Sequence, residues 1–333
     1  MARYCAGRTY PAHMFGPAEV YTRVLEAQER IRPHVLETAL EYSHYLSDLG
    51  GATVYCKLEN LQHTGSFKIR GAMNKVLWLS QAERERGVVA ASTGNHGAAV
   101  AYSADKLRVP GTIFVPENAD PFKVMAIEEL GGEVRYFGGD TAETETFARK
   151  YAAEQGLTYI SPYNDPEVIG GQGTIGAELE RQLDRVDAVF ISLGGGGLIS
   201  GIAGYLKSVF PEVRIIGCSP ENSQVMIQSI RAGRILDLPS LPTLSDGTAG
   251  GIEAGSITFE LCRALVDEYV TVTEEEIREQ LRLFIQNHNM VIEGAAAVAI
   301  ASYLNLCRRF SGKNVVIIIC GANISQDTLK EIL

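Results

Sequence analysis

Short apolar runs alternate with longer stretches of helical periodicity along most of the chain. Residues 88–91, 112–115 and 188–192 are apolar or β-branched runs of strand length, and each precedes a stretch with apolar side chains at helical spacing. Glycine and proline mark the joints between them. Strands this short and apolar, separated by helices, indicate parallel sheets that helices cover on both faces. We therefore predict an α/β fold of two lobes based on parallel sheets, with the ligand in the cleft between them.

The same pattern gives the extent of each expected element. The expected strands are residues 54–58, 88–91, 112–115, 133–137, 188–192, 214–217 and 315–319. The expected helices are residues 17–30, 71–80, 97–107, 121–130, 141–155, 167–183, 198–209, 257–266, 274–287 and 293–310, followed by a terminal helix. Residues 233–256 are rich in Pro, Gly, Ser and Thr, and we expect them to form a long functional loop. We assign residues 1–60 and 160–333 to a large domain and residues 61–159 to a small one.

Composition and charge exclude several classes of partner. The formal net charge is −10, so the surface repels phosphate backbones and we expect no nucleic-acid partner. No apolar run approaches the roughly 18 residues that span a bilayer, so we expect no membrane partner. The N-terminus lacks a secretory pattern and the six cysteines form no CxxC pair, which favours a cytoplasmic protein. Neither the cysteines nor the six histidines have metal-ligand spacing, so we predict no metal.

The first candidate for chemistry is Lys68, in the segment Thr64-Gly-Ser-Phe-Lys-Ile-Arg-Gly-Ala72. A desolvated lysine amine has a lowered pKa and becomes a nucleophile towards aldehydes. Taken alone, Lys68 is better explained as a surface lysine in the first turn of a helix. The rest of the chain has to decide between the two interpretations.

A run of four glycines, from Gly194 to Gly197, lies between an apolar strand and an apolar helix. Consecutive glycines let backbone amides turn towards one point, and the start of the helix adds a positive end, which suits phosphate. The run is neither a Walker loop nor a GxGxxG fingerprint. A tight packing turn without a ligand is the alternative.

Three further stretches add polar groups at the ends of predicted strands or the starts of helices. The turn from Ser92 to Gly97 suits a carboxylate, although, taken alone, an N-cap with a turn explains it better. Glu293 precedes an alanine-rich helix, where the helix dipole also favours an acid. Cys320 closes a buried strand, where a small core residue is the usual explanation. Together with the lysine and the glycines, these elements fit a phosphorylated aldehyde cofactor, of which pyridoxal 5'-phosphate is the common one.

Six motifs in order, SFKIRGA, STGNHG, GGQGTIGAE, GGGGLISG, IEGAAA and CGAN, then make a specific resemblance. From about Arg30 onwards the chain resembles the threonine/serine dehydratase family of fold-type-II (tryptophan synthase β-like) pyridoxal-phosphate enzymes. The resemblance implies an ammonia-lyase of amino-acid catabolism. Its reaction would be the β-elimination of a small amino-acid substrate such as L-threonine or L-serine to a 2-oxo acid and ammonia. It also implies a homodimer or a higher homo-oligomer.

The resemblance implies a role for each matching residue. Lys68 would link covalently to the cofactor and later transfer the proton, with Thr93 and Glu293 as further catalytic groups. The implied cofactor contacts are Phe67, Lys68, Asn95, Asn164, Gly194, Gly195, Gly196, Gly197, Leu198, Gly247 and Cys320. The implied substrate contacts are Ser92, Thr93, Asn95, His96 and Gly250. A neutral Cys320 thiol at the pyridine nitrogen would leave that nitrogen unprotonated.

Departures from the family pattern narrow the choice among relatives. Thr93 stands where eukaryotic-type serine racemases have a serine, which disfavours racemisation. The segment CSPENSQV has Ser219 and Val225 where those enzymes have metal-binding acids, so no such metal is expected. Glycines in residues 245–259 enlarge the substrate side, as in dehydratases of hydroxyectoine utilisation or of phenylserine. A serine racemase, a cysteine-synthase-like β-replacement enzyme and a non-catalytic ligand-binding homologue remain alternatives. We expect no regulatory domain and no feedback control by isoleucine.

Overall fold

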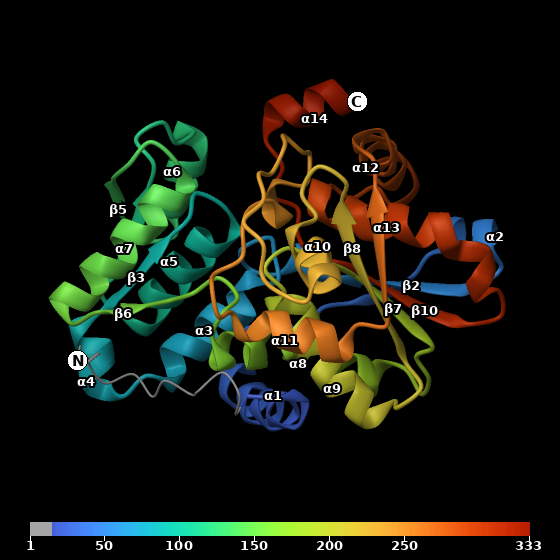
Figure 1. The fold of residues 1–333 in the computed structure, drawn as a ribbon, viewed down its shortest axis with the longest axis horizontal. Helices are drawn as coiled ribbons and strands as arrows, with labels where there is room; N and C mark the ends of the chain where they lie inside the picture. Colours follow the sequence, from blue (N-terminus) through green and yellow to red (C-terminus); the bar gives the residue numbers. More distant parts are fainter. Residues whose placement is uncertain (1–14) are drawn as a thin grey trace.

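Two sheets organise the molecule, which a computed structural model describes over residues 15–333. The larger sheet has the strand order β1-β2-β10-β7-β8-β9, and the smaller has the order β5-β4-β3-β6. Every pairing is parallel except that of β1 with β2. Figure 1 shows the smaller sheet and its helices on the left and the larger sheet on the right. The predicted α/β fold with parallel sheets is confirmed, whereas the expectations for the N-terminal segment and Cys5 lie outside the described residues.

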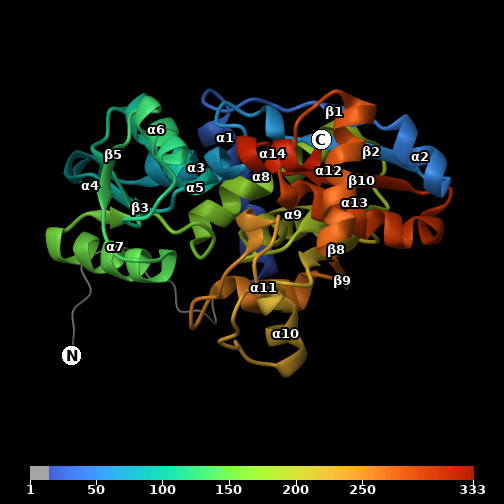
Figure 2. The same ribbon diagram turned by 90° about the horizontal axis from the view of Figure 1, so that it is seen from above.

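The smaller-sheet unit is a three-layer sandwich. Its strands are β3 (Val88–Ala91), β4 (Gly111–Val115), β5 (Glu133–Tyr136) and β6 (Thr158–Tyr159), and its helices are α4 (Gln81–Arg86), α5 (Asn95–Leu107), α6 (Pro121–Glu129) and α7 (Thr141–Gln155). Side chains alternate across β3, so that Val88 and Ala90 pack with α5 while Val89 and Ala91 pack with α7. Figure 2 shows α7 on one face of this sheet and α5 and α6 on the other, together with α3 (Lys68–Trp78), which also contacts the larger-sheet unit.

The larger-sheet unit is also covered on both faces. Its strands are β1 (Leu40–Tyr42), β2 (Thr53–Leu58), β7 (Ala188–Ser192), β8 (Arg214–Pro220), β9 (Glu268–Val272) and β10 (Asn314–Ile319). Its helices are α1 (Pro17–Ile31), α2 (His44–Gly50), α3 (Lys68–Trp78), α8 (Pro166–Gln182), α9 (Gly197–Val209), α10 (Val225–Ala232), α11 (Ile257–Leu265), α12 (Glu274–His288), α13 (Gly294–Leu306) and α14 (Gln326–Ile332). The 3-10 turns are η2 (Glu59–Leu61), η3 (Asp246–Thr248) and η4 (Cys307–Phe310). In Figure 1, α12 and α13 lie above the sheet and α1, α8 and α9 below it.

The predicted strands are all present, and their ends shift by three residues at most. The elements that the pattern missed are β1, β6 and β9 and the helices α2, α4 and α10. They are short, β1 is mostly exposed and β9 is largely half-buried, so these two strands lack the apolar run that marks a buried strand. The helix expected over 293–310 ends at Leu306 and continues as η4. The division into domains stays a prediction, although all strands of the smaller sheet fall within residues 61–159.

A fully buried ion cluster fixes α3, the helix that begins at Lys68. The Arg70 guanidinium bonds Glu59 (2.7 Å, Nε to Oε2) and Glu178 (2.6 Å, Nη1 to Oε1), and Lys57 Nζ lies 2.5 Å from Glu178 Oε2. The cluster has two positive and two negative side chains, so each of its four buried charges has a partner of the opposite sign. It ties α3 to β2, η2 and α8, and thereby holds the lysine end of α3 against the larger sheet.

No helix among residues 15–333 is both long and apolar enough to cross a membrane. The cysteines in this part of the chain are all free.

Candidate active site

The segment that carries Lys68 is joined to the end of β10. The Phe67 amide donates to the Cys320 carbonyl (3.0 Å), and the Ala322 amide donates to the Gly65 carbonyl (2.9 Å). These bonds extend strand pairing past β10 and bring the first residue of α3 beside the cysteine. Lys68 and Cys320, far apart in the sequence, therefore lie in one site.

The Lys68 amine is partly buried and is held by a single backbone acceptor. Its Nζ donates to the Pro162 carbonyl (3.0 Å) and lies 5.3 Å from the centre of the Phe67 ring. Burial lowers the pKa of Lys68 to about 8, although Glu293 and Cys320 act in the opposite direction. Near neutral pH a useful fraction of this lysine is therefore uncharged and nucleophilic.

Glu293 is buried at the N-terminus of α13 and faces the turn before α5. Asn95 Nδ2 donates to both of its carboxylate oxygens (3.1 and 2.9 Å), and the Asn323 amide donates to Oε2 (3.2 Å). Burial raises the pKa of Glu293 to about 7, and the charge of Asp246 adds to this, while the hydrogen bond from Asn95 opposes it. Glu293 therefore exchanges a proton near physiological pH.

Cys320 and two glycines surround the Glu293 carboxylate. The Cys320 Sγ lies 3.7 Å from Glu293 Oε1, and burial, with the nearby Glu293 charge, raises the pKa of this thiol well above its usual value. A Cβ on Gly321 would lie 2.6 Å from Oε2, and one on Gly247 would lie 3.5 Å from Oε1. Cys320 is thus a neutral thiol, and the carboxylate needs a glycine at 321.

The four glycines connect β7 to α9 in a turn that has no room for side chains. A Cβ on Gly195 would lie 2.4 Å from the Tyr163 ring, and one on Gly194 would lie 2.8 Å from the Thr248 carbonyl oxygen. Gly196 has φ +87°, a left-handed conformation that favours glycine. The turn leads directly into the N-terminus of α9 and its Leu198, where free backbone amides attract an anion. This arrangement fits a phosphate group.

The segment from Ser92 to Gly97 comprises the turn after β3 and the first residues of α5. The Gly94 amide donates to Ser92 Oγ (3.1 Å), and half-buried Thr93 lies between them. The imidazole of His96 donates from Nε2 to the Ile160 carbonyl (2.8 Å), and burial, with the charge of Lys68, lowers its pKa to about 3. This neutral ring anchors the turn to residue 160, so its predicted contact with the substrate stays a prediction.

Asn164 and Gly250 make their hydrogen bonds to the loop before α11 and to residues near it. Asn164 donates to Glu253 Oε2 (3.0 Å) and accepts from the Ile257 amide (3.0 Å), so it fixes the loop before α11. The Gly250 amide donates to the hydroxyls of Ser223 and Ser240 (3.3 and 3.1 Å). The described contacts thus join Lys68, Phe67, Asn95, Glu293, Gly247 and Cys320, and place Asn164 and Gly250 on the loop side.

Sequence reasoning missed several groups at this site. Asn323 donates from Nδ2 to the Thr64 carbonyl (3.0 Å) and to Asn95 Oδ1, and its position three residues after Cys320 was a signal that could have found it. Nothing in the sequence marks Tyr163, whose ring packs under the glycine turn. The hydroxyls of Thr64 and Ser66 are buried beside Lys68 without a partner in the described structure. Unsatisfied donors of this kind suit a polar ligand.

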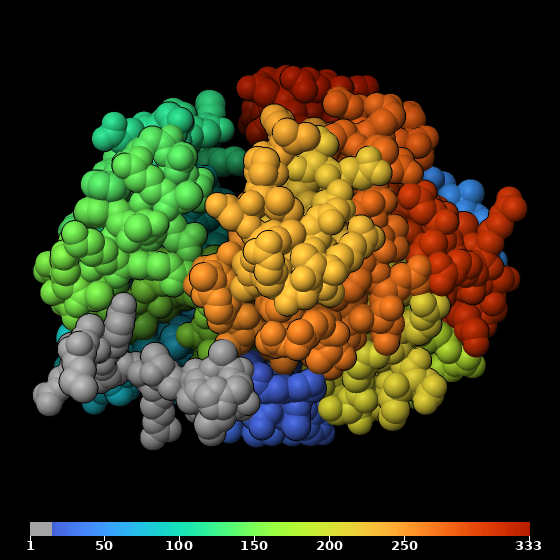
Figure 3. All heavy atoms as spheres, viewed as in Figure 1, coloured from blue at the N-terminus to red at the C-terminus, as the bar shows by residue number. Residues whose placement is uncertain are grey.

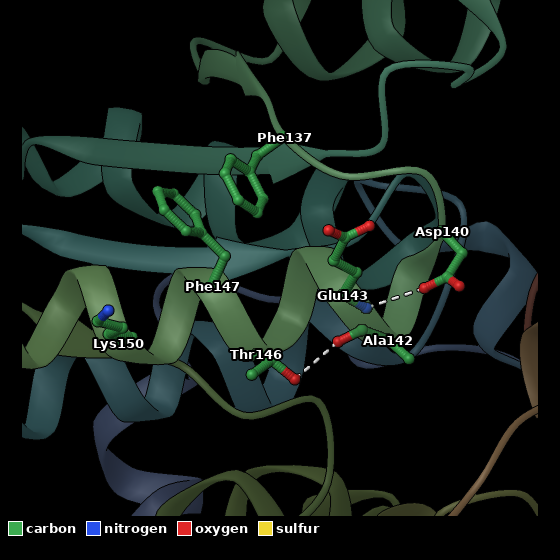
Figure 4. A pocket seen from close by; sticks show the side chains of 7 residues that line it. All are labelled: Phe137, Asp140, Ala142, Glu143, Thr146, Phe147 and Lys150. Carbon is green, nitrogen blue, oxygen red and sulfur yellow. Dashed lines mark hydrogen bonds between the residues drawn. The ribbon is translucent and has the colours of Figure 1, made fainter.

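The surface is hollowed between the two units, as Figure 3 shows between the green atoms of the smaller-sheet unit and the gold atoms of the loop before α11. A second hollow, shown in Figure 4, lies on the smaller-sheet unit where Phe137 stacks on Phe147 (3.5 Å between ring centres). It contains none of the predicted site residues. Within the described residues, no group of three or more His, Cys, Asp or Glu side chains is arranged to hold a metal ion.

Comparison with known proteins agrees with this geometry. Residues 31–321 match the family described as pyridoxal-phosphate dependent enzyme. The chain is 44% identical over 310 residues to an L-threonine ammonia-lyase of Thermotoga maritima, covering 93% of this chain and 77% of that protein. It is 40% identical to an L-threo-3-hydroxyaspartate ammonia-lyase of Saccharomyces cerevisiae, covering 92% and 94%. The structure of processed threonine deaminase isoform 2 from Solanum lycopersicum superimposes with a TM-score of 0.90 at 34% identity, covering 98% of each chain.

Proposed function

Because the chain belongs to the pyridoxal-phosphate dependent enzyme family, we propose that it dehydrates and deaminates a β-hydroxy amino acid, giving a 2-oxo acid and ammonia. The observation that carries this proposal is the Lys68 amine, with its lowered pKa, in one site with a glycine turn and a neutral thiol. The named activities of the relatives from Thermotoga maritima and Saccharomyces cerevisiae support it, since both are ammonia-lyases. L-Threonine and L-serine are the first substrates to expect.

The residues of the site fit the family's cofactor. The amides of the glycine turn and the start of α9 would hold the phosphate, Phe67 and Asn95 would contact the ring, and Cys320 would face its nitrogen. When bound, pyridoxal phosphate supplies an aldehyde for the amine and a conjugated ring that accepts the electron pair left by loss of the α-proton. The buried hydroxyls of Thr64 and Ser66, which lack partners, are consistent with a ligand beside Lys68.

The chain's own groups would move the protons. Lys68 donates to a single carbonyl, so its amine is free to take the α-proton from the substrate once the amino group is positioned. Glu293, with a pKa of about 7, can hold a proton within the site at neutral pH. The turn from Ser92 to Gly97 would orient the substrate carboxylate through its backbone amides, while His96 stays bound to Ile160.

We further propose that the protein acts in the cytoplasm as a homodimer or a larger homo-oligomer. The free cysteines of the described residues support a reducing compartment. Analogy with the family supports the oligomer.

The test is a panel of β-hydroxy amino acids given to the purified holoenzyme, with 2-oxo acid and ammonia as the measured products. We expect turnover of L-threonine or L-serine, and a loss on the order of 10³-fold or more in Lys68→Ala, because the reactive amine is removed. Lys75→Met is the matched control, since Lys75 lies on the same helix but pairs with Asp165 (2.6 Å). Inversion of the substrate without 2-oxo acid would instead identify a racemase.

A further inference from the structure

Two acids of the segment 246–256, which comprises η3 and the loop before α11, pair with cations of the smaller-sheet unit. Asp246 Oδ2 lies 3.1 Å from Lys123 Nζ on α6, and Glu253 Oε1 lies 2.6 Å from Arg149 Nη2 on α7. Figure 1 shows the gold and orange segment that contains this loop on the side of the larger-sheet unit that faces α6 and α7. Two carboxylates of this segment therefore join it to the smaller-sheet unit, across the site.

Glu253 is the most highly bonded residue of this loop. Besides Arg149, its carboxylate accepts from Asn164 Nδ2 (3.0 Å) and Ser161 Oγ (3.4 Å), and its amide donates to the Tyr163 hydroxyl (2.9 Å). Its side chain is 25% exposed, so these bonds are only partly screened by solvent. The Glu253 carboxylate is therefore fixed, and it holds one edge of the Arg149 guanidinium.

Three of the residues that bind Glu253, namely Ser161, Tyr163 and Asn164, belong to the segment that runs past the reactive lysine. Its Pro162 carbonyl accepts from Lys68, its Ile160 carbonyl accepts from His96, and its Tyr163 ring packs under the glycine turn. Arg149 is close enough to His96 for its positive charge to contribute to the lowered pKa of that ring. Arg149 is therefore a cation at the border of the site.

Among residues 15–333, the cations at this border other than Lys68 are already paired with carboxylates. Arg149 also binds Glu145 (2.7 Å) and Lys123 binds Asp246, whereas the Lys68 amine, which the reaction uses, donates to a carbonyl. Of the described cations here, none is therefore free for the second carboxylate of a substrate, which would face the charges of Asp246 and Glu253. Leaving such a charge unpaired at a desolvated site is costly.

We propose that Glu253 determines the class of substrate: by occupying Arg149 it restricts the enzyme to β-hydroxy amino acids with an uncharged side chain and rejects dicarboxylic ones. This inference rests on the β-elimination proposed above. Removing the Glu253 charge would leave Arg149 with one carboxylate instead of two, and its guanidinium could then bind a second substrate carboxylate in a bidentate manner.

The experiment compares kcat/KM for L-threonine and L-threo-3-hydroxyaspartate in wild type, Glu253→Gln and Glu253→Ala holoenzymes. We expect the ratio of hydroxyaspartate to threonine to rise at least about tenfold in both variants, the effect of one hydrogen bond to a charged group. In the double variant Glu253→Ala, Arg149→Met the gain should disappear, because the accepting cation is gone. Glu145→Gln is the matched control: it also leaves Arg149 with one carboxylate, but it keeps Glu253 bound to Nη2, so its ratio should stay within about threefold of wild type.

A second readout does not depend on turnover. L-Aspartate, which has no β-hydroxyl, should raise the melting temperature of Glu253→Ala more than that of wild type, and the double variant should lose this difference. An unchanged ratio and an unchanged aspartate shift in folded variants would overturn the role of Glu253 while leaving threonine turnover intact. Equal use of both substrates by wild type would overturn it too. Failure of the β-elimination itself would appear separately, as absence of 2-oxo acid from every substrate.

Discussion

The Phe67 amide donates to the Cys320 carbonyl over 3.0 Å, one residue before the reactive lysine and one residue after β10. This bond couples the position of the Lys68 backbone to the end of a strand at the centre of the larger sheet. The buried Arg70 cluster holds the same helix from the other side. The amine is thus placed by the rigid part of the fold, which is how an enzyme keeps a reacting group within tenths of an ångström.

The glycine turn should not tolerate even one methyl group at position 195. In Gly195→Ala the new Cβ would lie 2.4 Å from the Tyr163 ring, whose hydroxyl is bound by the Glu253 amide, so the ring or the turn must move. We expect the variant to lose about 1–3 kcal/mol of stability and at least about tenfold in cofactor affinity. Urea unfolding and titration with pyridoxal phosphate measure the two effects.

Gly251→Ala is the matched control for that substitution. A Cβ there has open space and the backbone has no positive φ, so stability and cofactor affinity should match wild type. Equal behaviour of the two variants would contradict the role of the turn.

Glu293 should make the cofactor-free protein less stable as pH rises. Its folded pKa, about 7, lies above its ordinary value of 4.5, so its favourable contribution is present below pH 4.5 and is lost as pH rises to 7. Glu293→Gln removes this pH-dependent loss of stability. It also removes the charge that raises the Lys68 pKa, so the variant's lysine loses its proton at lower pH and the variant gains stability as pH rises. Both effects make the variant more stable, relative to wild type, as pH rises.

We therefore expect the free energy of unfolding of Glu293→Gln, relative to wild type, to increase by about 2–3 kcal/mol between pH 5 and pH 7.5. Urea unfolding at the two pH values measures it. Asp327→Asn, an exposed change on α14, serves as the control and should give no such increase. A relative stability that does not increase over this range would show that Glu293 is already charged at pH 5.

Arg70→Met should be strongly destabilising, because it removes the positive charge that pairs with the buried carboxylates of Glu59 and Glu178. We expect a loss of about 3–5 kcal/mol in the free energy of unfolding, together with weaker binding of the cofactor at Lys68. Arg181→Met is the control, since Arg181 pairs with Glu37 at the surface and should lose less than about 1 kcal/mol. Similar losses in the two variants would mean that the cluster does not hold α3.

Three of the predicted site segments lie at the carboxyl ends of parallel strands. The glycine turn follows β7 and Cys320 follows β10 in the larger sheet, while Ser92 follows β3 in the smaller one, and the carboxyl ends of parallel strands gather at one edge of each sheet. Lys68 could be recognised because its neighbours in the sequence, Gly65 to Phe67, form the turn that presents it. Local motifs were sufficient for these groups.

The groups that escaped prediction depend on how distant segments pack. Tyr163 contacts the glycine turn only because the chain passes beneath it, and Arg149 meets Glu253 only because the smaller-sheet unit lies against the loop. The bond of His96 to the Ile160 carbonyl is equally non-local, and nothing in the sequence around either residue indicates it. Pairings between units leave no periodic pattern in either segment.

The central position of β10 has a consequence for the order in which the protein can form. Asn314 pairs with Thr53, and Val315 pairs with Ala188, so the strand synthesised last lies between two made much earlier. The smaller sheet, by contrast, consists of strands that follow one another between Val88 and Tyr159. During synthesis on the ribosome, the smaller sheet can close as soon as it emerges, whereas β2 and β7 must wait for β10 before the lysine meets the cysteine. Catalytic competence is therefore the last property that the growing chain acquires.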